Sequence, residues 1–183
     1  EIYLKGFEIA IRESDPWALM TSYNSVNGKF TQQNYDLVTT VLRDEWGFDG
    51  MVMTDWGFKE GTPYIVKSGN DLLQPGNQTE MERILAAAKD GTIKMEEIDR
   101  NVTRILEYVV KTPRFNGKSY NHDLRLEEHA ELVRNAADEG MVLLKNNGVL
   151  PLAPEQTVAL YGVGSYDLIA GGGGSGNVNK KYV

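Results

Sequence analysis

Cysteine is absent from this chain of 183 residues, and histidine occurs only twice. Without cysteine the chain can have no disulfide, no thiolate zinc site and no cysteine nucleophile. The two histidines, His122 and His129, lie in or next to a polar stretch that reads as a linker, which disfavours a histidine-rich metal site. We therefore expect neither a metal nor a cofactor.

Positive charge and long apolar runs are also scarce. The net charge is −7 and the basic residues are scattered, so no basic face is available for nucleic acid or an anionic membrane. No apolar run approaches the length of a membrane span. The chain begins at Glu1 without a signal-peptide pattern, and the sequons at Asn77 and Asn101 then read as chance matches. Together with the lack of cysteine, this favours a cytoplasmic over a secreted location.

Predicted helices and strands alternate along the first two thirds of the chain, which indicates an α/β protein with parallel strands. The apolar spacing predicts helices over residues 2–12, 31–46, 62–68 and 79–111 (interrupted at 91–92), and strands over 17–23, 51–54 and 70–74. Residues 24–28 read as a polar loop.

The alternation restarts after a polar segment broken by Pro113 and Gly117. A helix is predicted over 127–139 and strands over 141–145 and 157–161, the opening of a second α/β unit. We accordingly divide the chain into a first domain at 1–111, a linker at 112–126 and a second domain at 127–183. Both ends fall inside predicted elements, so the chain reads as a segment of a longer protein.

The segment from Gly47 to Trp56 carries the clearest functional signal. A tight turn leads into a short apolar strand, which ends in an acid and an indole side by side, Asp55 and Trp56. The carboxyl ends of strands in α/β proteins are where ligands and catalytic groups collect. The competing interpretation is that Asp55 caps the next helix, as aspartate often does after a strand.

The residue types around Asp55 favour a carboxylate nucleophile. No Gly-x-Ser-x-Gly elbow supports a serine hydrolase. Attack by a carboxylate is the chemistry of retaining glycosidases, in which a second carboxyl group about 5–5.5 Å away acts as acid and base. Trp56 offers a flat apolar face for a sugar ring, although a large aromatic can equally pack in the interior. Tyr23, after the preceding strand, can donate a hydrogen bond to Asp55 and hold its rotamer.

Other polar residues near the predicted strand ends are weaker candidates. Asn24 and Asn27 can form hydrogen bonds with sugar hydroxyls, but the competing interpretation of this segment is an ordinary turn. Asp71 is expected to have a structural role, bonding backbone amides near Pro75 and Gly76. Glu60 reads as a solvated loop residue, and the glycine-rich stretch 171–176 as a flap or a plain connector.

Five ordered blocks together resemble glycoside hydrolase family 3, most closely its multidomain β-glucosidases. They are Met20-Thr-Ser-Tyr-Asn-Ser-Val-Asn-Gly28, Leu42-Arg-Asp-Glu-Trp-Gly-Phe-Asp-Gly50, Val52-Met-Thr-Asp-Trp56, Gly69-Asn-Asp-Leu-Leu-Gln-Pro-Gly76, and Ala136-Ala-Asp-Glu-Gly-Met-Val-Leu-Leu-Lys-Asn146 followed by Leu150-Pro-Leu152. Each block is weak alone, but the ordered set is specific and spans nearly the whole chain.

The resemblance implies the C-terminal part of a (β/α)8 TIM-like barrel followed by the beginning of an α/β sandwich domain. It implies that Asp55 is the nucleophile, that Trp56 lines the sugar subsites and that Tyr23 lies beside the nucleophile. The general acid/base glutamate and the upstream sugar-binding blocks of the family are not in this chain, so we expect the chain alone to be inactive.

The implied activity is hydrolysis of terminal β-D-glucosyl residues of a β-linked oligosaccharide or glucoside. Alternatives on the same fold are a β-xylosidase, a β-N-acetylhexosaminidase or a glycoside phosphorylase. An alternative of another class is a segment that only binds sugar or serves as a scaffold. The sequence leaves the oligomeric state open.

Overall fold

The computed structural model describes residues 2–57, 61–167 and 170–177. The chain forms two compact units, Glu1–Tyr120 and Asn121–Val183, which are described one at a time. This division falls between two residues of the predicted linker. The assignment of 1–111, 112–126 and 127–183 as barrel part, linker and sandwich part stays a prediction.

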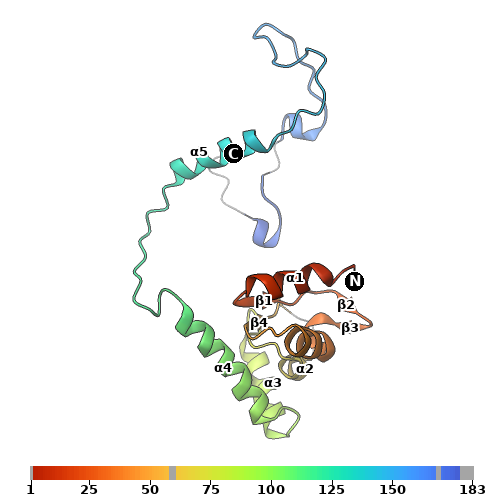
Figure 1. Cartoon of the computed structure of the whole chain (residues 1–183), viewed down its shortest axis with the longest axis vertical. Coiled ribbons are helices and arrows are strands. Elements are labelled where there is room, and N and C mark those ends of the chain that lie inside the picture. Colours follow the sequence, from red (N-terminus) through yellow and green to blue (C-terminus); the bar gives the residue numbers. More distant parts are fainter. Residues whose placement is uncertain (1, 58–60, 168–169, 178–183) are drawn as a thin grey trace. The chain divides into compact units, whose positions relative to one another are not determined.

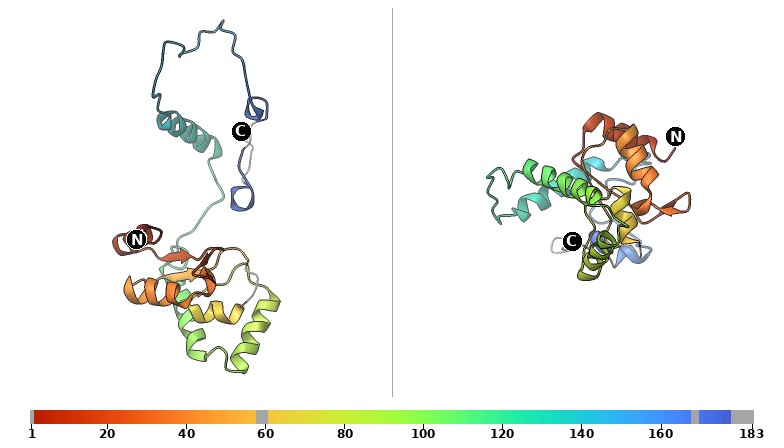
Figure 2. Two further views of the ribbon diagram at one scale, coloured as in Figure 1. Left: turned by 90° about the vertical axis from the view of Figure 1, so that its right-hand side faces the viewer. Right: turned by 90° about the horizontal axis from the view of Figure 1, so that it is seen from below.

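The first unit alternates helices with short strands (Figure 1). Its elements are α1 (Lys5–Ser14), β1 (Ala18–Met20), β2 (Ser25–Val26), β3 (Lys29–Phe30), η1 (Thr31–Gln33), η2 (Asp36–Glu45), β4 (Met51–Met53), α2 (Thr62–Ser68), α3 (Gln78–Lys89) and α4 (Met95–Lys111). In Figures 1 and 2, α1 lies above the strands of this unit and α3 below them.

The strands pair in parallel, as the alternation of elements predicts. β1 pairs with β4, Leu19 opposite Val52, and Met53 at the end of β4 forms a parallel bridge with Leu72. The chain therefore runs from β1 through η2 to β4, and from β4 through α2 to the segment around Leu72. This βαβ order confirms the α/β class and places three strand-like segments side by side.

The third predicted strand, 70–74, is reduced to that single bridge, and the predicted helix 31–46 is divided. A 3₁₀ turn (η1) is followed by a helix of the π type (η2). The predicted polar loop 24–28 belongs to a small antiparallel hairpin, in which Ser25 pairs with Phe30 and Val26 with Lys29. Hairpins this short carry no apolar alternation, so the sequence pattern did not indicate one.

Gly50 sets how closely β4 approaches the segment before β1. A Cβ added at Gly50 would lie 2.6 Å from the Trp17 carbonyl oxygen, which is itself the acceptor for the Met51 N–H at 3.0 Å. Only glycine fits this contact, because the first hydrogen bond of the β1–β4 pair requires the two backbones to meet there.

Two apolar clusters hold the elements around the strands. In the first, Ile11 of α1 and Val38 and Leu42 of η2 pack with Phe48 and Val52. In the second, Val66 of α2 packs with Ala87 and Ile93, with Leu73, Ile84 and Ile98 at its edge. These clusters fix both crossover connections against the strands, and so fix the positions of the strand ends.

A buried ion cluster joins three parts of the first unit. The Asp71 carboxylate, whose side chain is 0% exposed, lies 2.8 Å from Arg43 Nη2 and 3.3 Å from Arg104 Nη1, and accepts from Val52 N–H at 2.8 Å. Burial raises the pKa of Asp71, while the Val52 N–H and both arginines oppose that shift. Asp71 thus has the structural role we predicted, but its partners are Val52 and two arginines rather than the amides near Pro75.

The second unit contains helix α5 (Leu126–Gly140) and two short 3₁₀ turns, η3 (Val163–Ser165) and η4 (Gly174–Gly176). The strands predicted at 141–145 and 157–161 are wrong for this structure, because both segments are irregular. Their apolar side chains lie in solvent, with Leu144 92% exposed and Leu160 69% exposed. A strand needs a neighbouring strand to satisfy its backbone, and none lies beside them in the described part of the unit.

Candidate active site

The three predicted site residues follow the carboxyl ends of β1 and β4. Beyond the strands, Thr21 N–H donates to Met53 O at 2.9 Å and Asp55 N–H donates to Thr21 O at 3.1 Å. The hydrogen bonds between the two strands therefore continue as far as Thr21 and Asp55. Tyr23 and Asp55 accordingly leave the sheet at the same edge, where the carboxyl ends of β1 and β4 lie.

Direct contacts link these residues. The Tyr23 hydroxyl donates to the Trp56 carbonyl oxygen at 2.5 Å, and the Trp56 N–H donates to Asp55 Oδ1 at 2.6 Å. The structure thus brings together Tyr23, Asp55 and Trp56 from two different strand ends. One carboxylate oxygen of Asp55 is held by the backbone of its own turn, which restrains the direction of the carboxyl group.

The surroundings of these side chains bear on the structural alternatives. Helix α2 has Gly61 at its N-cap and no side-chain cap, so Asp55 does not cap the helix that follows it. The Trp56 side chain is 67% exposed and is not packed in the interior of this unit, and Tyr23 is 55% exposed. An acid beside two accessible aromatic faces is suited to a ligand with a polar rim and an apolar face.

The third segment reaches the same edge, as a parallel strand predicted over 70–74 implies, but the contacts that Gln74 makes there were not predicted. Gln74 N–H donates to Thr54 Oγ1 at 2.8 Å, and Gly57 N–H donates to Gln74 O at 2.8 Å. Gln74 and the cis-bonded Pro75 therefore lie next to the Asp55 turn. The Pro75-Gly76 pair, which marks the end of the predicted strand, was the signal for this position, and no local pattern indicated the partners of Gln74.

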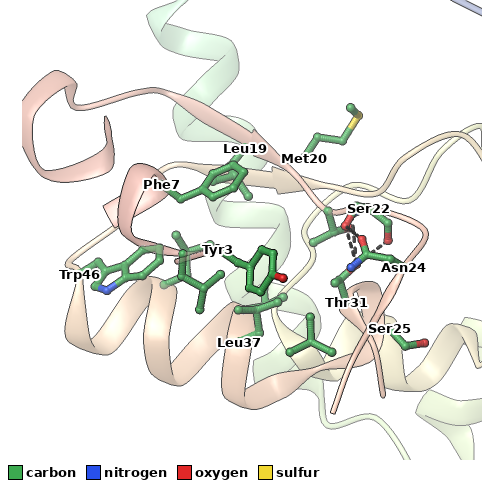
Figure 3. A pocket seen from close by; sticks show the side chains of 15 residues that line it. Tyr3, Phe7, Leu19, Met20, Ser22, Asn24, Ser25, Thr31, Leu37 and Trp46 are labelled. Carbon is green, nitrogen blue, oxygen red and sulfur yellow. Dashed lines mark hydrogen bonds between the residues drawn. The ribbon is translucent and has the colours of Figure 1, made fainter. Parts of the chain in front are cut away.

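The turn after Tyr23 is braced internally. Ser22 Oγ donates to Asn24 Oδ1 at 2.6 Å, Ser22 N–H donates to Thr31 Oγ1 at 3.1 Å, and the Thr31 hydroxyl donates to the Ser22 carbonyl (Figure 3). The side-chain oxygen of Asn24 therefore accepts a hydrogen bond within the turn. Asn27 has a left-handed backbone conformation, with φ at 51°. Glu60 lies outside the described residues.

A groove of about 830 Å³ lies beside this edge (Figure 3). Aromatic and aliphatic side chains, among them Tyr3, Phe7, Leu19 and Trp46, dominate its lining. Asp55 is not among the lining residues. The groove therefore does not present the candidate acid to a ligand, and Tyr23, Asp55 and Trp56 stay the candidate site residues.

The acid changes the ionisation of its neighbour. Partial burial raises the pKa of the Tyr23 hydroxyl above its ordinary value of 10.0, and the nearby charge of Asp55 raises it further. Deprotonating the phenol would place a second negative charge beside a carboxylate. Tyr23 therefore stays a hydrogen-bond donor over the whole neutral range.

We expect Asp55→Asn to lower the pKa of Tyr23, because the charge that opposes phenolate formation is removed while the burial remains. A ¹³C NMR titration of the chain labelled at tyrosine Cζ measures this, with Tyr23→Phe assigning the resonance. Asp44→Asn removes an exposed carboxylate on η2 and is the matched control, expected to leave that pKa unchanged. A Tyr23 pKa that does not fall in Asp55→Asn would contradict the proximity of the two groups.

Among the described residues no group of three or more histidine, cysteine, aspartate or glutamate side chains is placed to hold a metal ion. No helix in the described ranges is both long and apolar enough to cross a membrane. The absence of a cofactor stays a prediction.

Comparison with known proteins identifies relatives along the whole chain. Residues 1–108 match the glycosyl hydrolase family 3 N terminal domain. The chain is 42% identical to β-glucosidase B of Emericella nidulans over 100% of its own length and 22% of that protein, and 36% identical to an exo-α-(1→6)-L-arabinopyranosidase of Bifidobacterium longum over 97% and 25%.

The solved structures agree with the sequence relatives. β-Glucosidase 3B of Thermotoga neapolitana, in complex with α-D-glucose, matches with a TM-score of 0.86 and 42% identity over 99% of this chain and 26% of that one. A β-glucosidase of Bifidobacterium adolescentis matches with a TM-score of 0.70 and 40% identity over 84% and 23%. The chain thus spans about a quarter of the length of these relatives.

Proposed function

Because the chain belongs to glycosyl hydrolase family 3, we propose that it forms the nucleophile-bearing part of a retaining β-glucosidase, with Asp55 as the nucleophile. The observation that carries this proposal is the position of Asp55. It follows β4 at the edge where Tyr23 also emerges, and its carboxylate accepts from Trp56 N–H at 2.6 Å. The support is thus an oriented carboxylate whose neighbours at this edge include two exposed aromatic residues.

The chemistry follows from that placement. Asp55 attacks the anomeric carbon of a terminal β-D-glucosyl unit as the bond to the leaving oxygen breaks, which forms a glycosyl ester. A general acid protonates the leaving oxygen and then, as base, takes a proton from the water that cleaves the ester. Two displacements at one carbon return the starting configuration. The negative charge of Asp55 also stabilises the oxocarbenium-like transition state.

Trp56 and Tyr23 have different roles in this proposal. The exposed indole provides a face on which the apolar side of a pyranose ring can stack. The Tyr23 hydroxyl donates to the Trp56 carbonyl and so ties the β1 end to the turn that carries Asp55. Tyr23 thereby positions the acid, and its raised pKa keeps the phenol protonated.

The acid/base glutamate is proposed to lie in a part of the relatives that this chain does not cover, so that residues 1–183 alone do not turn over substrate. A chimera that supplies the parts of the relatives absent from this chain is therefore the suitable protein for the test. This chain would replace the matching 26% of the Thermotoga neapolitana enzyme, which it matches with a TM-score of 0.86.

We expect the chimera to hydrolyse 4-nitrophenyl β-D-glucoside in preference to the β-xyloside and the β-N-acetylglucosaminide, with no increase on adding phosphate. The panel includes the α-L-arabinopyranoside, because relatives of that name match the chain at 36% identity. A folded chimera that prefers another glycoside would overturn the glucosidase assignment, and stimulation by phosphate would favour a phosphorylase. Glucose binding by the isolated chain, followed by Trp fluorescence, with an inactive chimera would favour a sugar-binding segment.

A further inference from the structure

A cleft of about 440 Å³ lies between the segment that enters β4 and helix α4. Asp55 follows β4, so this cleft is at the opposite end of the strand from the candidate acid. Three arginines line it: Arg43 from η2, and Arg100 and Arg104 from successive turns of α4. The exposed acids Asp49 and Glu107 also lie on its lining.

Arg100 has fewer partners than a half-buried guanidinium requires. Its Nε donates to Asn101 Oδ1 at 3.2 Å, but its Nη2 is buried without a hydrogen-bond partner. In the described part of the chain no carboxylate lies within 4.0 Å of Arg100. Arg43, whose side chain is 5% exposed, likewise has a buried Nε with no partner. A buried charged donor left unpaired is costly unless a ligand or solvent satisfies it.

The arginines of this cleft have few carboxylate partners within ion-pair distance. Asp71 is shared between Arg43 and Arg104, at 2.8 Å and 3.3 Å, so one buried carboxylate pairs with two guanidinium groups and, within the ranges that the structure describes, Arg100 is left without one. Neither Asp49 nor Glu107 comes within ion-pair distance of an arginine among the described residues. Burial lowers the pKa of Arg43 to about 10, and Arg104 and Arg100 add to that shift while Asp71 opposes it.

We propose that this cleft binds a phosphate group, with Arg100 as its principal ligand and Arg104 as the second. A phosphate group carries the acceptor oxygens that the buried nitrogens of Arg100 and Arg43 lack, and the planar fork of arginine matches its geometry in a bidentate manner. The cleft is larger than one phosphate ion, so either inorganic phosphate or a phosphate ester of a small molecule fits. The site is independent of the proposed hydrolysis, because none of its residues lies at the Asp55 edge.

The test is ligand-dependent thermal stability of the complete chain, followed by tryptophan fluorescence. All three tryptophans, Trp17, Trp46 and Trp56, lie in the first unit, so the signal reports on the unit that contains the cleft. Inorganic phosphate and phenyl phosphate are titrated against sodium chloride of equal ionic strength. We expect the melting temperature to rise with either phosphate and to saturate as one site fills. The compound with the lower dissociation constant shows whether the cleft binds the free phosphate ion or a phosphate ester.

Arg100→Gln is expected to raise the dissociation constant for phosphate at least about tenfold, the loss expected for a charge-assisted hydrogen bond. Arg100→Lys keeps the charge without the fork and should give an intermediate constant. Arg114→Gln removes an exposed arginine that does not line the cleft and should bind as the unmodified chain does. Equal stabilisation by chloride and phosphate, or an unchanged constant in folded Arg100→Gln or Arg100→Lys, would overturn the proposal.

Discussion

Asp55→Ala is expected to lower kcat of the chimera by a factor on the order of 10⁴ to 10⁶, the loss that follows removal of a nucleophile acting as part of a unit. This corresponds to about 5–8 kcal/mol in the activation barrier. The reason is the position of the carboxylate at the carboxyl edge of β4, oriented by the Trp56 N–H. In the proposed mechanism its removal leaves the anomeric carbon without an attacking group, while the aromatic faces proposed to stack on the sugar remain.

The stereochemistry of chemical rescue separates a nucleophile from an acid/base residue. Removing Asp55 leaves a void on the face that the nucleophile attacks, so azide added to Asp55→Ala should displace an aryl leaving group from that side and yield α-D-glucosyl azide. Removing the acid/base group would instead leave the glycosyl ester intact, and azide would give the β product. Product anomers are read directly by ¹H NMR of the anomeric proton.

Asp44→Ala is the control for this substitution, because it deletes an exposed carboxylate on η2 within the same unit. We expect its kcat to match that of the unmodified chimera. Two results would remove Asp55 from the nucleophile role: Asp55→Ala retaining activity like that of Asp44→Ala, or β-glucosyl azide as its rescue product.

The features of the site that could be predicted are those that depend on residues close together in the sequence. Asp55 and Trp56 follow an apolar run directly, so the strand-end position could be read from the segment itself. The alternation of helices and strands then implied parallel pairing and placed Tyr23 at the same edge. The Gln74–Thr54 contact joins residues 20 apart. It depends on how α2 packs, which no local pattern specifies.

Long-range packing also explains what was missed elsewhere. The segments 141–145 and 157–161 have the apolar, β-branched composition of strands, but composition records only a preference for a paired, half-buried surface. Without a partner strand in the described part of their unit they stay irregular, and Leu144 remains 92% exposed. The Arg43–Asp71–Arg104 cluster joins residues 28 and 33 positions apart, so its acid could be identified as structural while its partners could not.

Asp71→Asn is expected to lower the free energy of unfolding of the first unit by about 3–5 kcal/mol, the cost of leaving a buried charge without its partner. Arg43 has only this carboxylate within ion-pair distance in the described chain, and Arg104 shares it. Because burial already raises the pKa of Asp71 against the pull of both arginines, the intact pair adds little net stability. The large loss comes from the arginines that remain, and urea denaturation followed by Trp fluorescence measures it.

Two further variants separate this explanation from a simple loss of attraction. Asp36→Asn breaks the exposed Lys29–Asp36 pair, whose side chains are 62% and 76% exposed, and should cost at most about 1 kcal/mol. The double variant Asp71→Leu with Arg43→Met removes the buried pair as a unit and should recover much of the stability that Asp71→Asn loses, although Arg104 still faces the site. If Asp71→Asn costs no more than Asp36→Asn, the Asp71 carboxylate is not what compensates the buried charges of Arg43 and Arg104.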